Sequence, residues 1–140
     1  MMKREWVSIY RPMSLSLAII FGFVGLLFLF MPEEILVFFN NLSLMSGFQK
    51  SPVHNTSVYV VLAVGYMYLV TLIAYFMYKN PQNTVYPFFL VNGKAASSIL
   101  SLLIFVFSMP YLIFLTNALV DGLIALGVFM LRKKIQGALR

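Results

Sequence analysis

The sequence has no cysteine, one histidine and few charged residues, and each shortage removes a class of protein. Without cysteine, the chain cannot form disulfides, thiolate metal sites or cysteine-bound iron–sulfur clusters. With His54 alone, it cannot hold a haem between two histidines. Of its 140 residues, 10% are charged and 61% are hydrophobic, whereas soluble domains carry about 25% charged residues. This composition does not suit a water-soluble domain, and the lipid bilayer is the expected environment and partner.

Motifs that would mark an enzyme or a cofactor site are also missing from the sequence. It contains no glycine-rich phosphate loop and no nucleophile elbow. Glu33 and Glu34 are adjacent and would point in different directions on a helix, so they do not suggest a metal site. No cofactor or metal is predicted, and an enzyme is the less favoured class. The net charge of +6 comes from basic residues that flank apolar runs, so no nucleic-acid partner is predicted either.

Four apolar runs are long enough to cross a bilayer, which takes about 20 helical residues. They extend over about 13–31, 57–78, 86–108 and 110–131. The first is preceded by basic residues, as a signal peptide would be, but it is too long and lacks a small-residue cleavage site after it. We therefore expect it to remain in the mature protein. The predicted fold is all-α, an integral membrane four-helix bundle forming a single domain over residues 1–140.

Basic residues are distributed unequally between the two ends of these runs. The opposite end of the predicted bundle has Lys50, together with Glu33, Glu34 and His54. The positive-inside rule then predicts a multi-pass protein of the inner (plasma) membrane with both termini in the cytoplasm. Eight basic residues support this orientation, namely Lys3, Arg4, Arg11, Lys79, Arg132, Lys133, Lys134 and Arg140.

The segment between the first two runs is too long for a simple turn, and its first half has helical periodicity. A proline followed by two glutamates, at 32–34, suits the start of a helix. Apolar residues then recur at helical spacing, with Asn40 and Asn41 expected on a wetter face. We predict a short helix over about 33–45 that lies on the outer membrane surface and contacts lipid or a partner through Phe38, Phe39 and Leu42.

Two ionisable residues, Lys94 and Asp121, fall inside apolar runs, where charge is costly. Lys94 precedes Ser108 by 14 residues and Asp121 follows it by 13. A tight antiparallel hairpin therefore places both roughly 20 Å from the turn, where they are predicted to pair. Further polar side chains share the same helix faces, namely Ser97, Ser98 and Ser101 with Lys94, and Asn117 with Asp121.

This predicted intramembrane polar site has three interpretations. A buried lysine and aspartate can exchange charge states when a proton, an ion or a polar headgroup arrives, which would make the site functional. The pair can also be a static structural contact. In the third interpretation, Lys94 extends towards the headgroups and the serines simply allow close helix packing. The sequence leaves all three open.

Two further patterns concern packing. In the second run, Tyr66 and Tyr68 lie near mid-span and need hydrogen-bond partners in the interior, with a quinone or lipid contact as the alternative. In the first run, small residues share one helix face, which predicts close packing within the chain, with dimerisation as the alternative. These small residues are Ser14, Ala18, Gly22 and Gly25.

The chain as a whole resembles the small four-span bacterial membrane proteins grouped as DoxX-like. The resemblance lies in its length, its four spans, the segment from Gly22 to Pro32 and the short helix after it. It implies a membrane protein with one of several accessory roles. Lys94 and Asp121 are not carried over from that family.

Three classes of function follow from these patterns. A non-enzymatic accessory or assembly subunit of a larger membrane complex is favoured by the missing catalytic motifs, the short loops and the amphipathic outer helix. The alternative is a protein that handles a small molecule, a lipid or quinone, or protons through Lys94 and Asp121. An enzyme acting on a lipid or quinone ranks third, because no acid–base pair beside a substrate cleft can be identified.

Overall fold

The computed structural model describes residues 2–54 and 57–139, which form five helices and no β-strand. Four of these helices contain an apolar stretch of 22 or 23 residues that is long enough to cross a membrane. The predicted all-α four-helix bundle is therefore confirmed, and its composition identifies a multi-pass membrane protein. The helices are α1 (Met2–Phe30), α2 (Pro32–Ser46), α3 (Ser57–Lys79), α4 (Val85–Phe107) and α5 (Leu112–Leu139).

The predicted boundaries differ most from the structure in the first and last spans. Helix α1 begins at Met2 rather than near residue 13, with Pro12 inside it, and α5 continues to Leu139 rather than ending near residue 131. Hydropathy marks only the part of a helix that suits the hydrocarbon. The polar turns that extend these two helices beyond their apolar stretches were for that reason not predicted.

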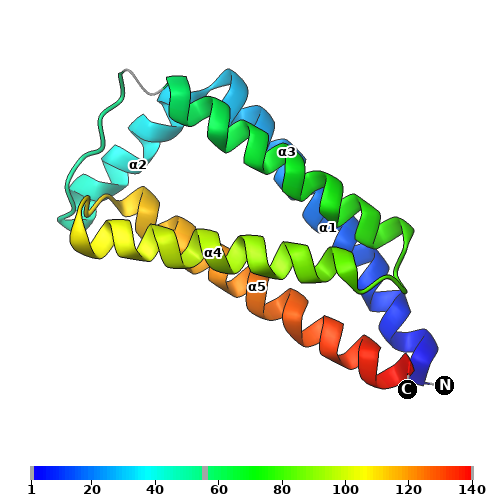
Figure 1. Cartoon of the computed structure of the whole chain (residues 1–140). Coiled ribbons are helices and arrows are strands. Elements are labelled where there is room, and N and C mark those ends of the chain that lie inside the picture. Colours follow the sequence, from blue (N-terminus) through cyan, green and yellow to red (C-terminus); the bar gives the residue numbers. More distant parts are fainter. Residues whose placement is uncertain (1, 55–56, 140) are drawn as a thin grey trace.

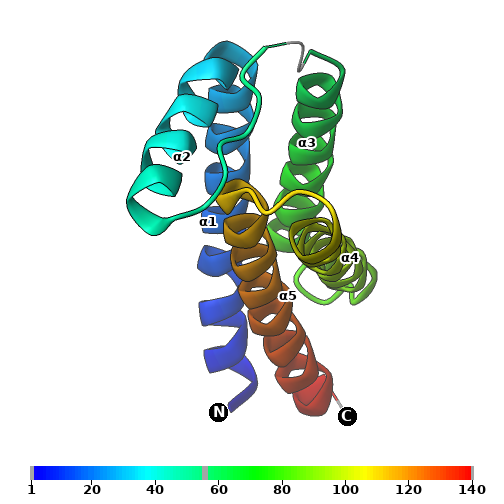
Figure 2. The same ribbon diagram turned by 90° about the vertical axis from the view of Figure 1, so that its left-hand side faces the viewer.

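The four spans are arranged as two helix pairs. Helix α1 packs along α3, and α4 packs along α5. The pairs meet at the end of the molecule that holds Met2 and Leu139, which we call the terminal end, and they diverge towards the opposite end (Figure 1). Helix α2 crosses that opposite end, here called the α2 end, and contacts both α1 and α5 (Figure 2).

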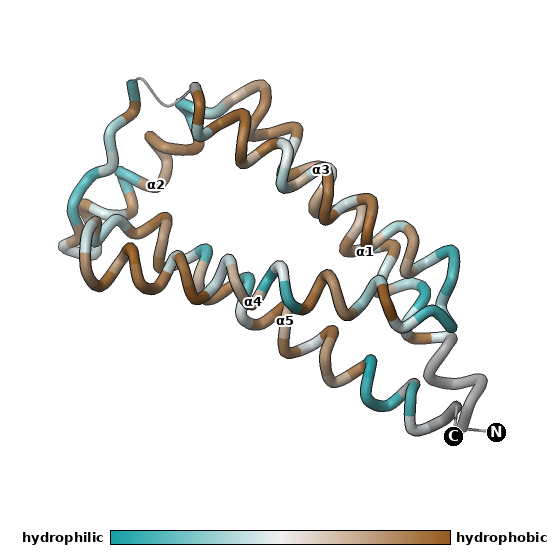
Figure 3. The backbone as a smooth tube through the Cα atoms, in the orientation of Figure 1, coloured by the Kyte–Doolittle hydropathy of each residue, from teal (hydrophilic) through white to brown (hydrophobic). Residues whose placement is uncertain are grey.

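The buried core occupies the terminal half of the bundle. The parts of the four spans nearest the α2 end, residues 26–30, 58–69, 102–107 and 112–117, contain no buried side chain, although Tyr66 and Met67 are partly buried against the core. These segments are largely apolar (Figure 3). Their exposure would be unfavourable in water, whereas lipid chains can cover them without a comparable cost. The apolar residues of the core are Tyr10, Ala18, Phe21, Val70, Ala74, Met77, Leu90 and Val128.

The small-residue face of α1 packs against α3, as predicted for packing within the chain. A Cβ atom at Gly25 would lie 3.1 Å from the Met67 Cβ, and one at Gly22 would lie 3.6 Å from the Thr71 Cγ2. Ser14, on the same face, is fully buried. Small residues allow two backbones to approach closely enough for extensive van der Waals contact, which stabilises helix pairs in lipid.

Helix α2 is one residue longer at each end than predicted, and one of its polar residues lies where the sequence did not place it. Asn40 is 8% exposed, so the expectation of a wet environment for it is wrong. Its side chain accepts a hydrogen bond from the Ser51 backbone N–H (2.8 Å) and donates one to the Ser51 carbonyl oxygen (2.9 Å). Asn41 is exposed as expected. Asn40 thus anchors the loop after α2, which leaves the helix at Gly47 in the left-handed conformation (φ 74°).

Candidate functional site

Lys94 and Asp121 meet at the middle of the α4–α5 pair. The Lys94 Nζ lies 2.7 Å from the Asp121 Oδ1, and the two side chains are 3% and 4% exposed. The tight connection from Ser108 to Tyr111 sets this register, because it brings residues at equal distances from the turn to the same depth. Figure 3 shows hydrophilic residues near the middle of the largely apolar α4–α5 pair.

The Lys94 ammonium also contacts the other helix pair. It lies 4.6 Å from the ring centroid of Phe21 on α1 and 5.0 Å from that of Tyr66 on α3. Cations are attracted to aromatic ring faces, most strongly where water is excluded. Side chains from the three other spans, α1, α3 and α5, therefore surround one buried charge on α4. Sequence reasoning had identified Tyr66 as needing a partner, but nothing in the periodicity distinguishes Phe21 from the other phenylalanines.

A second group of polar contacts lies next to the ion pair, towards the α2 end. The Asn117 amide donates to the Ser97 Oγ (3.1 Å) and to the Ser101 Oγ (2.7 Å). Ser98 donates its hydroxyl to the Ala118 carbonyl oxygen at 2.6 Å. All six residues of the predicted polar site thus lie at the α4–α5 interface. Interhelical hydrogen bonds of this kind stabilise helix pairs in lipid by about 0.6 kcal/mol on average.

Two buried polar atoms beside the ion pair are unsatisfied. The Asp121 Oδ2 makes no hydrogen bond in the structure. The Tyr66 hydroxyl is close enough to Asp121 and Ser97 to interact electrostatically, but it too makes no hydrogen bond of normal geometry. Buried polar groups without partners are rare in native structures and call for an explanation, such as a water, a proton or a ligand.

This geometry narrows the three interpretations of the site. Lys94 is buried and paired, which rules out the interpretation in which it extends to the headgroups. A static ion pair and a pair that changes its charge state both fit the 2.7 Å contact. The packing around the ammonium favours the static pair, because rings from two other helices hold it in place. The unsatisfied oxygens of Asp121 and Tyr66 favour a pair that changes its charge state.

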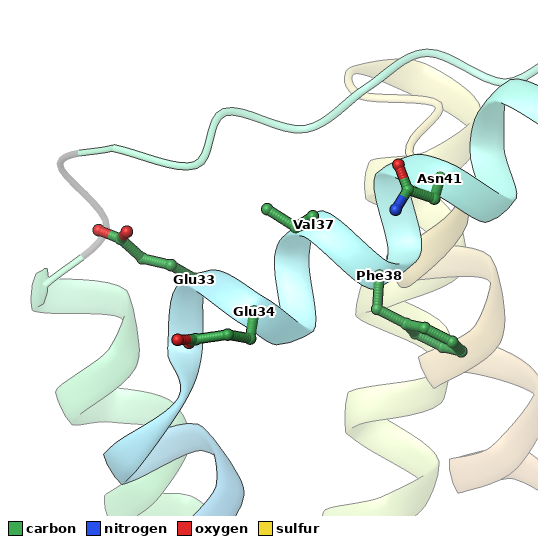
Figure 4. A pocket seen from close by; sticks show the side chains of 5 residues that line it. All are labelled: Glu33, Glu34, Val37, Phe38 and Asn41. Atoms are coloured by element: carbon green, nitrogen blue, oxygen red, sulfur yellow. The ribbon is translucent and has the colours of Figure 1, made fainter.

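A shallow hollow of about 450 Å³ lies on α2, at the end of the molecule away from the termini. Residues of α2 alone line it, so no second helix closes it, and Phe38 is the large apolar side chain at its edge (Figure 4). Phe38 is 59% exposed and Leu42 is 36% exposed, whereas Phe39 is half-buried. An open hollow on one helix suits coverage by lipid or protein better than enclosure of a small molecule. The hollow is lined by Glu33, Glu34, Val37, Phe38 and Asn41.

No protein-family model, curated protein or solved structure matches this chain. The resemblance to DoxX-like proteins accordingly stays an expectation from the sequence.

Proposed function

We propose that this membrane protein is a non-enzymatic accessory or assembly subunit of a larger membrane complex. One observation carries the proposal, namely that the spans are packed from the terminal end through mid-span but have no buried side chain in the turns nearest the α2 end. In lipid, helices associate through close packing and polar contacts rather than through the hydrophobic effect. The diverging pairs therefore offer helix faces against which an apolar helix of another subunit can pack.

Helix α2 strengthens this proposal because it presents apolar side chains at the same end of the molecule. Phe38, Leu44 and Met45 are 59%, 60% and 86% exposed. Large apolar patches that remain uncovered within a chain often mark contacts with a partner or a membrane. We propose that α2 lies at the membrane surface and that Phe38, Phe39 and Leu42 contribute to the contact with the partner subunit.

Site-specific photocrosslinking in native membranes tests this proposal. A photoreactive residue at Phe38 or Met45 should form adducts with one discrete membrane protein, whereas the same residue at Leu123, 70% exposed at mid-span on α5, should label lipid. Purification in mild detergent should then recover that protein with the chain. Lipid adducts at all three positions would refute a subunit role, because no partner would cover the α2 end.

The orientation in the membrane is part of the same proposal. The positive-inside rule supports a cytoplasmic location for both termini, in the inner membrane of a bacterial cell. A reporter that is active only in the cytoplasm should work when inserted near Gln82 and fail when inserted near Lys50. Activity near Lys50 alone would reverse the orientation.

The two unsatisfied oxygens beside the ion pair favour a second candidate function, the handling of protons or of a small polar molecule. A proton on the Asp121 Oδ2 would neutralise the carboxylate, and a small polar ligand between it and the Tyr66 hydroxyl would give both atoms a hydrogen-bond partner. Proteoliposomes containing a pH-sensitive dye test the proton-handling form. Protein-dependent proton flux that Asp121→Asn abolishes and Lys133→Met preserves would support this candidate, and flux equal to that of empty vesicles would remove its proton-handling form.

A further inference from the structure

A small niche at the terminal end contains two buried donors that the ion-pair site does not use. It lies between α1, the α3–α4 turn and the last part of α5, and has a volume of about 10 Å³. A space of this size holds about one water-sized group. Asn83 at its rim is exposed, so the niche reaches the surface. It is lined by Tyr10, Pro81, Asn83, Thr84, Pro87 and Arg132.

The donors are the Tyr10 hydroxyl and the Arg132 Nε, both buried and without a hydrogen-bond partner. The Tyr10 side chain is only 1% exposed. Ser14 interacts with the Tyr10 phenol only outside normal hydrogen-bond geometry, and its hydroxyl donates to the Tyr10 carbonyl oxygen at 2.8 Å. The Arg132 guanidinium is held over the Phe88 ring, with its central carbon 5.1 Å from the ring centroid. Two positioned donors therefore line one niche, and neither of them has an acceptor.

The chemistry of these groups selects an anionic oxygen. Arginine is always charged and only donates hydrogen bonds, and it binds phosphate and carboxylate oxygens more strongly than neutral acceptors. The Asn83 Oδ1 accepts the Val85 backbone N–H at 2.9 Å, so its NH₂ group is the part that can meet a ligand. A group bound here would thus contact donors of three types: phenol, guanidinium and amide.

The charged side chains around the niche also favour an anionic ligand. Exposed cations at this end of the bundle include Arg11, Lys79 and Lys133. Among the side chains that the structure describes, the carboxylates lie elsewhere, two of them on α2 at the opposite end and one paired with Lys94. A positive potential of this kind attracts anions to the membrane surface.

The position of the niche relative to the spans indicates the source of the anion. The apolar stretches Ser8–Phe30 and Leu112–Lys134 begin and end at the level of the niche, because Tyr10 and Arg132 are the third residue of one and the third from the end of the other. Headgroup phosphates lie at this boundary between hydrocarbon and water. We propose that the niche binds one phosphate oxygen of an anionic phospholipid headgroup, with Tyr10 and Arg132 as its donors. The rest of the headgroup would lie at the exposed rim, near the basic side chains.

Native mass spectrometry of the full chain, released from mild detergent, tests this proposal with added phosphatidylglycerol. Phosphatidylcholine and inorganic phosphate at the same concentration serve as comparators. The wild-type chain should bind phosphatidylglycerol most tightly. Tyr10→Phe and Arg132→Gln should each weaken that binding roughly tenfold, since each removes one hydrogen bond to a charged group. Lys133→Met, which removes an exposed charge from the same end, should change it by less than about threefold.

Each contrary result would overturn the proposal in a distinct way. Equal losses in Lys133→Met and Arg132→Gln would mean that general surface charge attracts the lipid. Unchanged binding in Tyr10→Phe, which keeps the ring and its packing, would mean that a water fills the niche. Inorganic phosphate or phosphatidylcholine binding as tightly as phosphatidylglycerol would exclude an anionic headgroup as the specific ligand.

Discussion

Neutralising one partner of the Lys94–Asp121 pair should destabilise the protein, and the two single substitutions should lower the free energy of unfolding by different amounts. Removing one member of a buried ion pair typically costs about 3–5 kcal/mol, because the other charge remains buried without compensation. Lys94→Met leaves the buried Asp121 carboxylate without a counter-ion and should fall in this range. The two side chains are 3% and 4% exposed, so water offers little compensation.

Asp121→Asn should cost less than Lys94→Met because the ammonium keeps other partners. Its Nζ remains 4.6 Å and 5.0 Å from the centroids of Phe21 and Tyr66. Desolvated cation–π contacts are worth about 2 kcal/mol each, and the asparagine oxygen can still accept a hydrogen bond. We therefore expect Asp121→Asn to be less destabilising by about 2 kcal/mol. The double variant should recover part of the Lys94→Met loss, since no unpaired charge remains.

Unfolding free energies in mixed detergent micelles, followed by circular dichroism, measure all three variants. Lys79→Met is the control, because it removes an exposed lysine and should change the free energy by less than about 1 kcal/mol. Two results would refute the reasoning. One is wild-type stability in both single variants, and the other is strict additivity in the double variant, which would mean that the two residues are not energetically coupled.

Two more predictions compare matched substitutions. A Cβ at Gly122 would lie 3.0 Å from the Ser98 Oγ, whereas one at Gly127 meets nothing within 4 Å. Gly127→Ala should therefore stabilise α5 by up to about 1 kcal/mol. Gly122→Ala should give no such stabilisation, because Ser98 must move to make room for the new methyl group. Equal thermal midpoints for the two variants would contradict this prediction. Asn40→Ala should speed amide hydrogen exchange across the loop after α2, because the Asn40 side chain anchors that loop. Asn41→Ala, a change at an exposed position, should leave the exchange unchanged. Unchanged protection of the loop in both variants would contradict the anchoring role of Asn40.

The spans and the depth of the ion pair could be predicted because each depends on a local property of the sequence. Hydropathy over about 20 residues locates a spanning helix. Equal separations from one tight turn place Lys94 and Asp121 at the same depth. The small-residue face of α1 was likewise visible as a periodic pattern that implies a packed neighbour.

The remaining features depend on tertiary arrangement, which helical periodicity does not specify. The sequence showed that α1 carries a packing face, but not that Phe21 would reach the Lys94 ammonium. It placed Asn40 on a wet face because polar residues are usually exposed, yet the loop after α2 folds back and buries it. The divergence of the two helix pairs and the niche at Tyr10 and Arg132 were missed for the same reason, since each depends on distances between helices.

The position of Lys94 explains how two separately packed helix pairs form one bundle. Small residues join α1 to α3, and polar contacts join α4 to α5. Lys94 belongs to the second pair, yet its ammonium contacts Phe21 and Tyr66, one from each helix of the first. Towards the α2 end, beyond this contact and the neighbouring Asn117 hydrogen bonds, no side chain of the segments 26–30, 58–65, 102–107 and 112–116 is buried. The pair therefore lies near the boundary between the packed and the open parts of the bundle, so loss of the Lys94 charge should allow the two helix pairs to separate further.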